Sequence, residues 1–252
     1  MQNHFTIIID SCNHEQWINK CLDTCLSQKY DNYEVILVDA KSDDKTFEIA
    51  QEYAKDFKNL KVYQNEKRLP QVANFLWLTK LCQPNTICVS VDSDDWLKHG
   101  KVLQVLNEVY NSGNIFMTYG SYIEFCGDDK PLRDVSWHYH AYPDDVIKNN
   151  SFREYKWVAS HLRTWRRELL LKINIEDFKR EDGEWFDTAG DQAIMLPMLE
   201  LSGNKSRHIS ETLLVYNTAN QQRDGATNEP RQVALANYIR AKKKYNPIDN
   251  LD

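Results

Sequence analysis

The chain has 252 residues, a net charge of −6 and an ordinary globular balance of 42% hydrophobic and 27% charged residues. This length is enough for one large domain or two small ones with a sizeable hydrophobic core. The acidic balance excludes the broad basic surface with which proteins bind nucleic acid or an anionic membrane.

The N-terminus and the cysteines indicate the compartment. No apolar stretch approaches the roughly 20 residues that span a bilayer, and the first residues lack the charged and apolar regions of a signal peptide. The six cysteines include no CxxC pair, so we expect reduced, buried thiols in a cytoplasmic protein without a transmembrane segment. A zinc site made of His14, Cys21 and Cys25 is an alternative, although these residues lack the paired spacing of such sites.

The first half of the chain alternates between apolar runs of strand length and stretches of helical spacing. Strands are predicted over residues 5–9, 33–40, 60–65 and 86–92. Helices are predicted over residues 14–28, 43–57, 71–82 and 99–113. Because the strands are apolar on both faces, this order favours a parallel sheet covered by helices.

The second half is less regular. A strand is predicted over 115–125, a strand followed by a helix within 152–173, a helix bent at Pro197 over 191–203, a strand over 210–218 and a helix over 229–244. The sequence contains no internal repeat and no low-complexity linker. We therefore expect one domain with two parts, residues 1–126 and 127–252.

Small polar and acidic residues end three of the predicted strands: Asp10 and Ser11, Asp39, and Asp92 to Asp95. Ligands of open α/β sheets bind beyond the carboxyl ends of the strands, so these residues predict a cleft there. Carboxylates gathered at the end of a buried strand repel one another and lose hydration, and a divalent cation would offset that cost. No GxGxxG or GxxxxGK[ST] element follows any strand, which excludes those two nucleotide-binding loops.

Five short motifs stand in order along the chain: a small polar turn at 11–13, Ser-Gln-Xaa-Tyr at 27–30, Val-Asp followed by Ser-Xaa-Asp-Xaa-Thr over 38–46, Asp-Xaa-Asp at 92–94, and an Xaa-Asp pair at 190–191 before an apolar helix. Together they resemble family 2 glycosyltransferases of the GT-A fold over about residues 4–218. The resemblance implies an α/β fold with a mostly parallel, Rossmann-like central sheet flanked by helices. A smaller C-terminal part would bind the acceptor.

The chain departs from the family pattern in four places. Asp10 stands where Pro is common after the first strand, Ala40 replaces the second Asp after Val-Asp, and Gly190 replaces the Glu of a Glu-Asp box. Of a Gly-rich, Arg-Asn segment in the third βα unit, only Arg68 and Asn74 are kept. We expect the chain to adopt the fold of the family despite these changes.

The resemblance implies a Mn²⁺ or Mg²⁺ site for the diphosphate of a nucleotide sugar. Asp94 is then the direct metal ligand, Asp92 contacts the ribose or reaches the metal through water, and Asp95 holds neighbouring backbone or substrate. A solvated acidic turn or a helix N-cap is the alternative for this cluster. His161 and His208 are candidates for a third ligand, with a structural role as the alternative.

The resemblance also implies a site for a pyrimidine nucleotide. Asp39 is expected to accept a hydrogen bond from the uracil ring N–H. Ser11, Asn13 and Ser93 are expected to border the nucleotide. Arg68 is expected to contact the base or the ribose, with a plain surface cation as the alternative.

Asp191 is the candidate general base of an inverting transfer, in which a carboxylate takes the proton of the acceptor hydroxyl as its oxygen attacks C1. A helix N-cap is the alternative role for Asp191, and Asp187 is the nearest rival carboxylate. Trp185 and Phe186 are expected to stack on the acceptor, with core packing as the alternative.

Two further segments have a predicted role at the substrate. The aromatic and His-rich stretch 137–142 is interpreted as an acceptor loop, with a core strand as the alternative. The polar segment 217–228 could close over the diphosphate with Arg223 as a phosphate contact, or it could be a connector.

These inferences converge on a soluble, metal-dependent, inverting glycosyltransferase. It would move a hexose from a UDP-sugar to a hydroxyl of a glycan or glycoprotein, a collagen-type glycan being one candidate acceptor. A nucleotidyltransferase is one alternative, but no Gly-rich basic loop follows the first strand. A non-catalytic sugar-nucleotide-binding module is another, and the presence of both Asp94 and Asp191 disfavours it.

Overall fold

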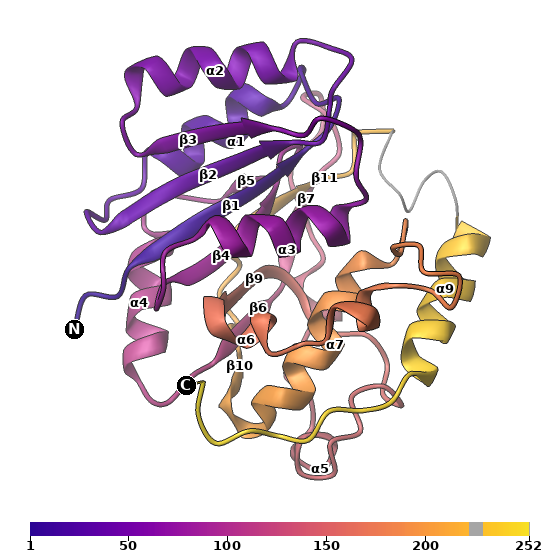
Figure 1. The fold of residues 1–252 in the computed structure, drawn as a ribbon. Coiled ribbons are helices and arrows are strands. Elements are labelled where there is room, and N and C mark those ends of the chain that lie inside the picture. The colour runs from indigo at the N-terminus through magenta and orange to yellow at the C-terminus, as the bar shows by residue number, and fades with distance from the viewer. Residues whose placement is uncertain (222–228, 252) are drawn as a thin grey trace.

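The computed structural model describes residues 1–221 and 229–251 and shows two sheets with helices packed around them (Figure 1). The large sheet has seven strands in the order β10-β6-β9-β4-β1-β2-β3. Their bounds are β1 Phe5–Ser11, β2 Tyr33–Asp39, β3 Leu60–Gln64, β4 Ile87–Asp92, β6 Met117–Gly120, β9 Ser160–Arg166 and β10 Ser206–His208. The small sheet has four strands in the order β5-β11-β7-β8. Their bounds are β5 Trp96–Leu97, β7 Tyr122–Phe125, β8 Arg133–Asp134 and β11 Leu214–Asn217.

Helices cover both faces of the large sheet. Their bounds are α1 Ile18–Leu26, α2 Thr46–Asp56, α3 Gln71–Leu81, α4 Val102–Asn111, α5 Asp144–Lys148, α6 Arg167–Leu171, α7 Gly190–Ser202 and α9 Glu229–Ala241. Short 3₁₀ turns occupy Ser136–His138, Ile175–Phe178 and Gly203–Lys205. Ile7 and Ile9 of β1 join the core formed with α1 and α4, whereas Ile8 joins the core formed with α3, α6 and α7. Because successive side chains of a strand point to opposite faces, β1 is buried on both.

The strand–helix alternation predicted for the first half is confirmed, with element ends displaced by a few residues. β1 pairs in parallel with β2 on one side and with β4 on the other, and β2 pairs in parallel with β3. The carboxyl ends of β1 and β4 therefore lie side by side, with Asp10 opposite Asp92 in the register.

The strand predicted over 115–125 is divided into β6 and β7, which belong to different sheets. The chain passes very close to its neighbours at the end of β6. A Cβ atom added at Gly120 would lie 3.1 Å from the Ile209 carbonyl oxygen and 3.2 Å from that of His161. β9 is antiparallel to both β4 and β6 and brings the second half of the chain into the large sheet.

The two predicted parts of the chain share their sheets. β9 and β10 of the second part complete the large sheet, and β11 joins β5 and β7 of the first part in the small sheet. A buried ion pair between Arg153 and Glu200 holds the second part together, with Arg153 Nε 2.5 Å from Glu200 Oε1. Arg153 Nη1 also donates to the Ile239 carbonyl, which attaches α9 to α7.

The part of the chain that the structure describes contains no helix long and apolar enough to cross a membrane. All six cysteines are free thiols. Four of them are buried, namely Cys21, Cys25, Cys82 and Cys88.

Candidate active site

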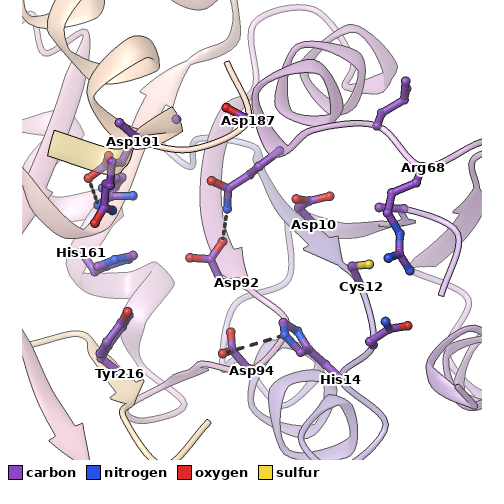
Figure 2. Close-up of a pocket in the computed structure, with 18 residues that line it drawn as sticks. Asp10, Cys12, His14, Arg68, Asp92, Asp94, His161, Asp187, Asp191 and Tyr216 are labelled. Carbon is purple, nitrogen blue, oxygen red and sulfur yellow. Dashed lines mark hydrogen bonds and ion pairs between the residues drawn. The ribbon is translucent and has the colours of Figure 1, made fainter. Parts of the chain in front are cut away.

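A cavity of about 480 Å³ lies at the carboxyl ends of β1 and β4 (Figure 2). The β1 loop, the β4 end, the start of α3, β9, β11, the start of α7 and α9 all contribute to its wall. The lining residues include Asp10, Cys12, Asn13, His14, Arg68, Gln71, Asp92, Asp94, His161, Arg163, Asp187, Asp191, Tyr216 and Gln232. The cleft predicted from the polar strand ends is therefore present.

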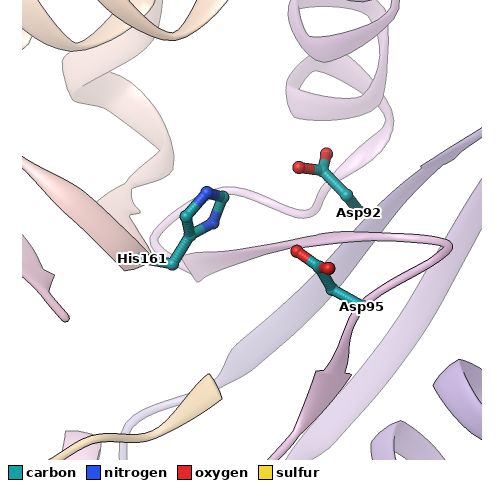
Figure 3. A group of neighbouring side chains, drawn as sticks. All are labelled: Asp92, Asp95 and His161. Atoms are coloured by element: carbon teal, nitrogen blue, oxygen red, sulfur yellow. The ribbon is translucent and has the colours of Figure 1, made fainter. Parts of the chain in front are cut away.

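Three side chains beside this cavity meet at the spacing of a metal site. Ligand atoms of Asp92, Asp95 and His161 all lie within 4.8 Å of one another (Figure 3). Asp95 is fully buried and accepts a hydrogen bond from the Asn217 backbone N–H at 2.8 Å, whereas its Oδ2 has no partner in the described residues. A buried carboxylate oxygen without a donor, next to an imidazole, is suited to a divalent cation.

Burial sets the protonation of this cluster. It raises the pKa of Asp95 well above the usual range, and the carboxylates of Asp94 and Asp92 raise it further. It lowers the pKa of His161 well below its usual value, and Arg163 adds to this effect. His161 is therefore neutral at physiological pH, which is the form of histidine that binds metals. The residues thus fit a bound cation, whose charge would favour the ionised form of Asp95.

Asp94, the ligand that the family resemblance implies, has different partners in this structure. Its Oδ2 accepts a hydrogen bond from Asn220 Nδ2 at 2.7 Å and lies 4.0 Å from His14 Nε2. Ser93 Oγ is 2.6 Å from His14 Nδ1. Asp94 lines the cavity, but the side chains at ligand spacing combine Asp92 with Asp95 and His161.

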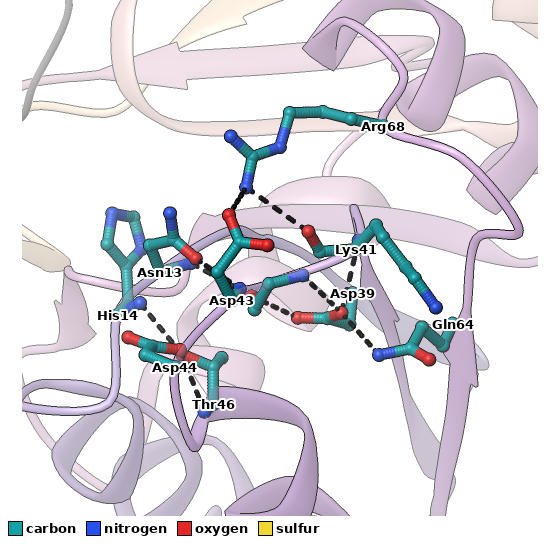
Figure 4. A network of polar contacts seen from close by, with 10 residues as sticks. Asn13, His14, Asp39, Lys41, Asp43, Asp44, Thr46, Gln64 and Arg68 are labelled. Atoms are coloured by element: carbon teal, nitrogen blue, oxygen red, sulfur yellow. Dashed lines mark hydrogen bonds and ion pairs between the residues drawn. The ribbon is translucent and has the colours of Figure 1, made fainter.

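The loops after β1 and β2 are joined by a polar network (Figure 4). Asn13 adopts a left-handed backbone conformation with φ of 58°. Its N–H donates to Ser42 Oγ at 2.9 Å, and its side-chain oxygen accepts from the Asp43 N–H at 2.8 Å. The His14 N–H donates to Thr46 Oγ1 at 2.8 Å. These bonds fix the wall of the cavity on which a nucleotide is expected.

Asp39 lies beneath this wall and does not line the cavity. It is fully buried, and its Oδ1 accepts hydrogen bonds from the N–H groups of Lys41 and Ser42 and from Gln64 Nε2. Its Oδ2 accepts from the Ser42 hydroxyl. The uracil contact stays a prediction, and it requires part of this network to open.

Arg68 is half-exposed and lines the cavity. Its Nη2 pairs with Asp43 Oδ2 at 3.0 Å and donates to the Lys41 carbonyl at 3.1 Å. Ser11 is buried, and its hydroxyl has no hydrogen-bond partner among the described residues. Ser11 does not line the cavity, whereas Arg68 does. The contacts of both residues with a nucleotide stay predictions.

Asp10, one of the departures from the family pattern, stands at the centre of the cavity wall. Burial raises the pKa of Asp10 to about 8. The hydrogen bond from Asn74 Nδ2, at 2.8 Å, opposes this shift, while the carboxylates of Asp92 and Asp39 add to it. A carboxyl group that holds its proton at neutral pH can donate a hydrogen bond to a ligand.

Asp191 lies in the first turn of α7 and lines the cavity, with 28% of its side chain exposed. Ala189 precedes the helix in the left-handed region, with φ of 55°. A Cβ atom added at Gly190 would lie 2.9 Å from Val72 Cγ2 on α3. This contact gives a physical reason for glycine in place of the family's Glu, since a longer side chain has no room there.

Arg163 is a functional candidate that sequence reasoning missed. It lies on β9 with only 13% of its side chain exposed, and its Nη2 donates to Asp191 Oδ2 at 3.3 Å. Its Nε is buried without a partner in the described residues. The sequence feature that could have identified Arg163 is a cationic residue inside an otherwise buried strand. Gln71 was also missed, and its Nε2 donates to Asp92 Oδ1 at 3.1 Å.

Asp187, the rival of Asp191, also lines the cavity. Its carboxylate pairs with Arg231 of α9, with Arg231 Nη2 2.6 Å from Asp187 Oδ2. Arg180 Nη1 lies 3.8 Å from the other oxygen. Asp187 therefore connects the segment before α7 to α9.

Neither residue of the aromatic pair before Asp187 lines the cavity. Phe186 is 1% exposed and packs against Tyr238, with Lys242 Nζ above its ring. Phe186 therefore has no exposed face for an acceptor, and core packing, the alternative, is what the structure shows. Trp185 is half-buried and lies beneath Lys179 Nζ, at 5.5 Å from the ring centroid. Its contact with an acceptor stays a prediction.

His208 lies on β10 against the Tyr119 ring and is absent from the cavity wall. Of the two histidines predicted as third ligands, His161 is thus the one beside the carboxylates. Tyr142 of the stretch 137–142 is buried, whereas Trp137 is exposed. Arg223 and most of its polar segment lie outside the described residues.

Comparisons with known proteins agree with this geometry. A sequence model described as Glycosyl transferase family 2 matches residues 6–173, which is more than half of the chain. The chain belongs to glycosyltransferase family 2. An uncharacterized glycosyltransferase of Haemophilus influenzae is 33% identical to it over 183 residues, which are 72% of this chain and 69% of that protein.

A second relative matches a shorter region of this chain. The Methanococcus voltae dolichyl N-acetyl-alpha-D-glucosaminyl phosphate 3-beta-D-2,3-diacetamido-2,3-dideoxy-beta-D-glucuronosyltransferase is 44% identical over 70 residues. These residues are 26% of this chain and 22% of that protein. The matched region is thus less than a quarter of the length of this relative.

Solved structures show the same fold. S. aureus TarS 1–349 in complex with UDP-GlcNAc superposes with a TM-score of 0.67 at 19% identity, over 89% of this chain and 61% of that chain. The Pyrobaculum calidifontis mannosyltransferase PcManGT, in complex with GDP-Man and Mn²⁺, superposes with a TM-score of 0.62 at 18% identity. The match covers 97% of this chain and 66% of that chain. The predicted GT-A fold is confirmed.

Proposed function

We propose that the transferase moves a hexose from a UDP-sugar to a hydroxyl of a glycan or glycoprotein, with inversion at C1 and with a bound Mn²⁺ or Mg²⁺. The observation that supports this proposal is that a cluster at metal-ligand spacing and a separate carboxylate border the same cavity. Asp92, Asp95 and His161 lie at metal spacing, and Asp191 lies on another part of the same wall.

Asp92, Asp95 and His161 would hold the cation. A divalent cation there would stabilise the charge that develops on the diphosphate leaving group. Gln71 orients the Asp92 carboxylate through its hydrogen bond of 3.1 Å. In the alternative set Asp94 is the ligand, and there the hydrogen bond from Asn220 to its Oδ2 would orient the carboxylate.

Asp191 would take the proton of the acceptor hydroxyl. Its carboxylate lines the cavity, and the hydrogen bond from Arg163 fixes its orientation. One protein carboxylate is enough for this chemistry, because the diphosphate leaves without being protonated. A fixed base in hydrogen-bond reach of the nucleophile contributes about 10²–10⁴ in rate.

The wall formed by Asp10, Asn13 and Arg68 would receive the nucleotide. The complex of TarS with UDP-GlcNAc supports a UDP-sugar, while that of PcManGT with GDP-Man shows that this fold also accepts a purine donor in another protein. Family membership disfavours the nucleotidyltransferase alternative. The presence of Asp191 in the cavity disfavours a non-catalytic module.

The proposal is tested by measuring nucleotide release from a panel of UDP- and GDP-sugars with Mn²⁺, with Mg²⁺ and with EDTA. We expect release of UDP from one donor with either cation and none with EDTA. The configuration of the transferred sugar, read by NMR from an α-linked donor, should be β. Release from no donor, or equal release in EDTA, would contradict the proposal.

A further inference from the structure

A continuous series of aromatic rings runs from the cavity to the surface. It begins at Tyr216, which lines the cavity and whose ring centroid lies 4.8 Å from that of Tyr122. The Tyr122 ring is 5.1 Å from Tyr139, Tyr139 is 6.5 Å from His138, and His138 is 3.5 Å from Trp137. These five residues are named the aromatic track.

The track joins elements that are far apart in the sequence. Tyr122 and Tyr216 lie on the paired strands β7 and β11. The other three rings belong to residues 137–139, within and directly after the Ser136–His138 turn. The hydroxyls of Tyr122 and Tyr139 are hydrogen-bonded at 2.7 Å. The Tyr216 ring also lies 5.5 Å from that of His161, so the track ends beside the candidate metal site.

Core packing does not account for the outer end of the track. Of the seven tryptophans, all within the described residues, Trp137 alone is exposed, at 73%. It stacks on His138, which is also exposed, so the pair presents its surface to water. Exposed aromatic surface that is continuous with a cavity is characteristic of a binding site.

The chemistry of the track matches a saccharide. A sugar ring has an apolar C–H face and a rim of hydroxyls, and Tyr, His and Trp offer an apolar face with a polar tip. The cation of the adjacent strand β8, Arg133, is already paired with Glu124. Arg133 is therefore not free to bind the phosphate of a lipid. The vesicle measurement described below tests that other class of acceptor.

We propose that the aromatic track binds the acceptor as an oligosaccharide, with its terminal unit at Tyr216 and the following units on His138 and Trp137. This inference rests on the proposed function and specifies its acceptor class. Binding through several units would explain why the rings continue beyond the cavity. A single sugar would reach only Tyr216.

The test measures binding of the transferase to an array of oligosaccharides that contain hexoses, N-acetylhexosamines and uronic acids. We compare the wild type with Trp137→Ala and with Phe57→Ala, an exposed aromatic that directly follows α2 and is not part of the track. Trp137→Ala should weaken binding to the best glycan by about tenfold or more, as for an aromatic anchor of an interface. Phe57→Ala should bind as the wild type does.

Nucleotide release without acceptor separates the two proposals. Both variants should release UDP at the wild-type rate, because neither position contacts the donor wall. If the wild type releases UDP, three results would overturn the acceptor proposal alone. These are undiminished glycan binding by Trp137→Ala, no binding of the wild type to any glycan, and binding to anionic phospholipid vesicles that depends on Trp137. No release by the wild type would overturn the proposed function.

Discussion

Arg163 Nη2 donates a hydrogen bond to Asp191 Oδ2 at 3.3 Å, which brings a largely buried cation of β9 against the first turn of α7. The two residues come from distant parts of the chain and meet at the cavity wall. A carboxylate held on one side by a guanidinium and on the other by its own helix start has little freedom to rotate. Arg163 is therefore a positioning residue for the proposed base.

We expect Arg163→Met to lower kcat by about tenfold to a hundredfold while KM for the donor changes little, because misplacement of a base affects the chemical step. Arg163→Lys should recover part of this loss, since it restores the charge without the planar fork. Steady-state kinetics with the identified donor decide the matter. A rise in donor KM with unchanged kcat would assign Arg163 to donor binding instead.

The metal site is tested through stability, which does not depend on activity. Mn²⁺ with UDP should raise the Tm of the wild type, because a ligand that binds only the folded state stabilises it. His161→Asn and Asp95→Asn should lose this shift relative to their own ligand-free Tm, and His208→Asn should keep it. Loss of the shift in Asp94→Asn, with retention in Asp95→Asn, would favour the ligand set that the family resemblance implies.

Gly190→Ala should destabilise the fold by about 1–3 kcal/mol, the usual result of overpacking. The added methyl group would meet Val72 Cγ2 at 2.9 Å. Val72→Ala should therefore be less harmful in the Gly190→Ala background than alone, and urea unfolding of the four proteins measures this coupling. Gly113→Ala is the matched control, since nothing lies within 4 Å of a Cβ atom there. Equal destabilisation in both glycine variants would refute the steric account.

His208 predicts a pH dependence of stability. Burial lowers the pKa of His208 below its usual value, with a smaller contribution from His140. Below about pH 6.5 the unfolded chain takes up a proton at this histidine before the folded chain does, so the free energy of unfolding falls as the pH falls. In urea unfolding, the free energy of unfolding of His208→Gln should decrease less between pH 7.5 and 5.5 than that of the wild type. An identical decrease in the free energy of unfolding of both proteins would count against the lowered pKa of His208.

The first half of the fold could be predicted because its signals are local. Continuous apolar runs such as that of β1 and helical spacing such as that of α1 are both readable over about ten residues. The place of β9 between β4 and β6 could not be predicted in this way, since it depends on contacts between distant segments. The division of 115–125 at Gly120 likewise depends on the approach of His161 and Ile209.

The candidate site was predictable in its position but not in its details. Asp92 was identified because acidic residues gather at the end of a predicted strand. Asp191 was identified because the Xaa-Asp pair before an apolar helix resembles the Glu-Asp box of the family. The choice between Asp94 and Asp95 at the metal cluster depends on which way the turn after β4 points each carboxylate. The pairing of Arg163 with Asp191 requires the tertiary fold, so no local pattern reveals it.

The central claim is that this cavity is the active site and that Asp191 is its base. The most direct measurement is the rate of sugar transfer by Asp191→Asn beside Asp187→Asn, with Asp31→Asn, an exposed residue at the opposite ends of the strands, as the control. We predict a loss of about a hundredfold or more in Asp191→Asn, as for removal of a general base, and much smaller losses in the other two. Near-normal transfer by Asp191→Asn, or a larger loss in Asp187→Asn, would contradict the account.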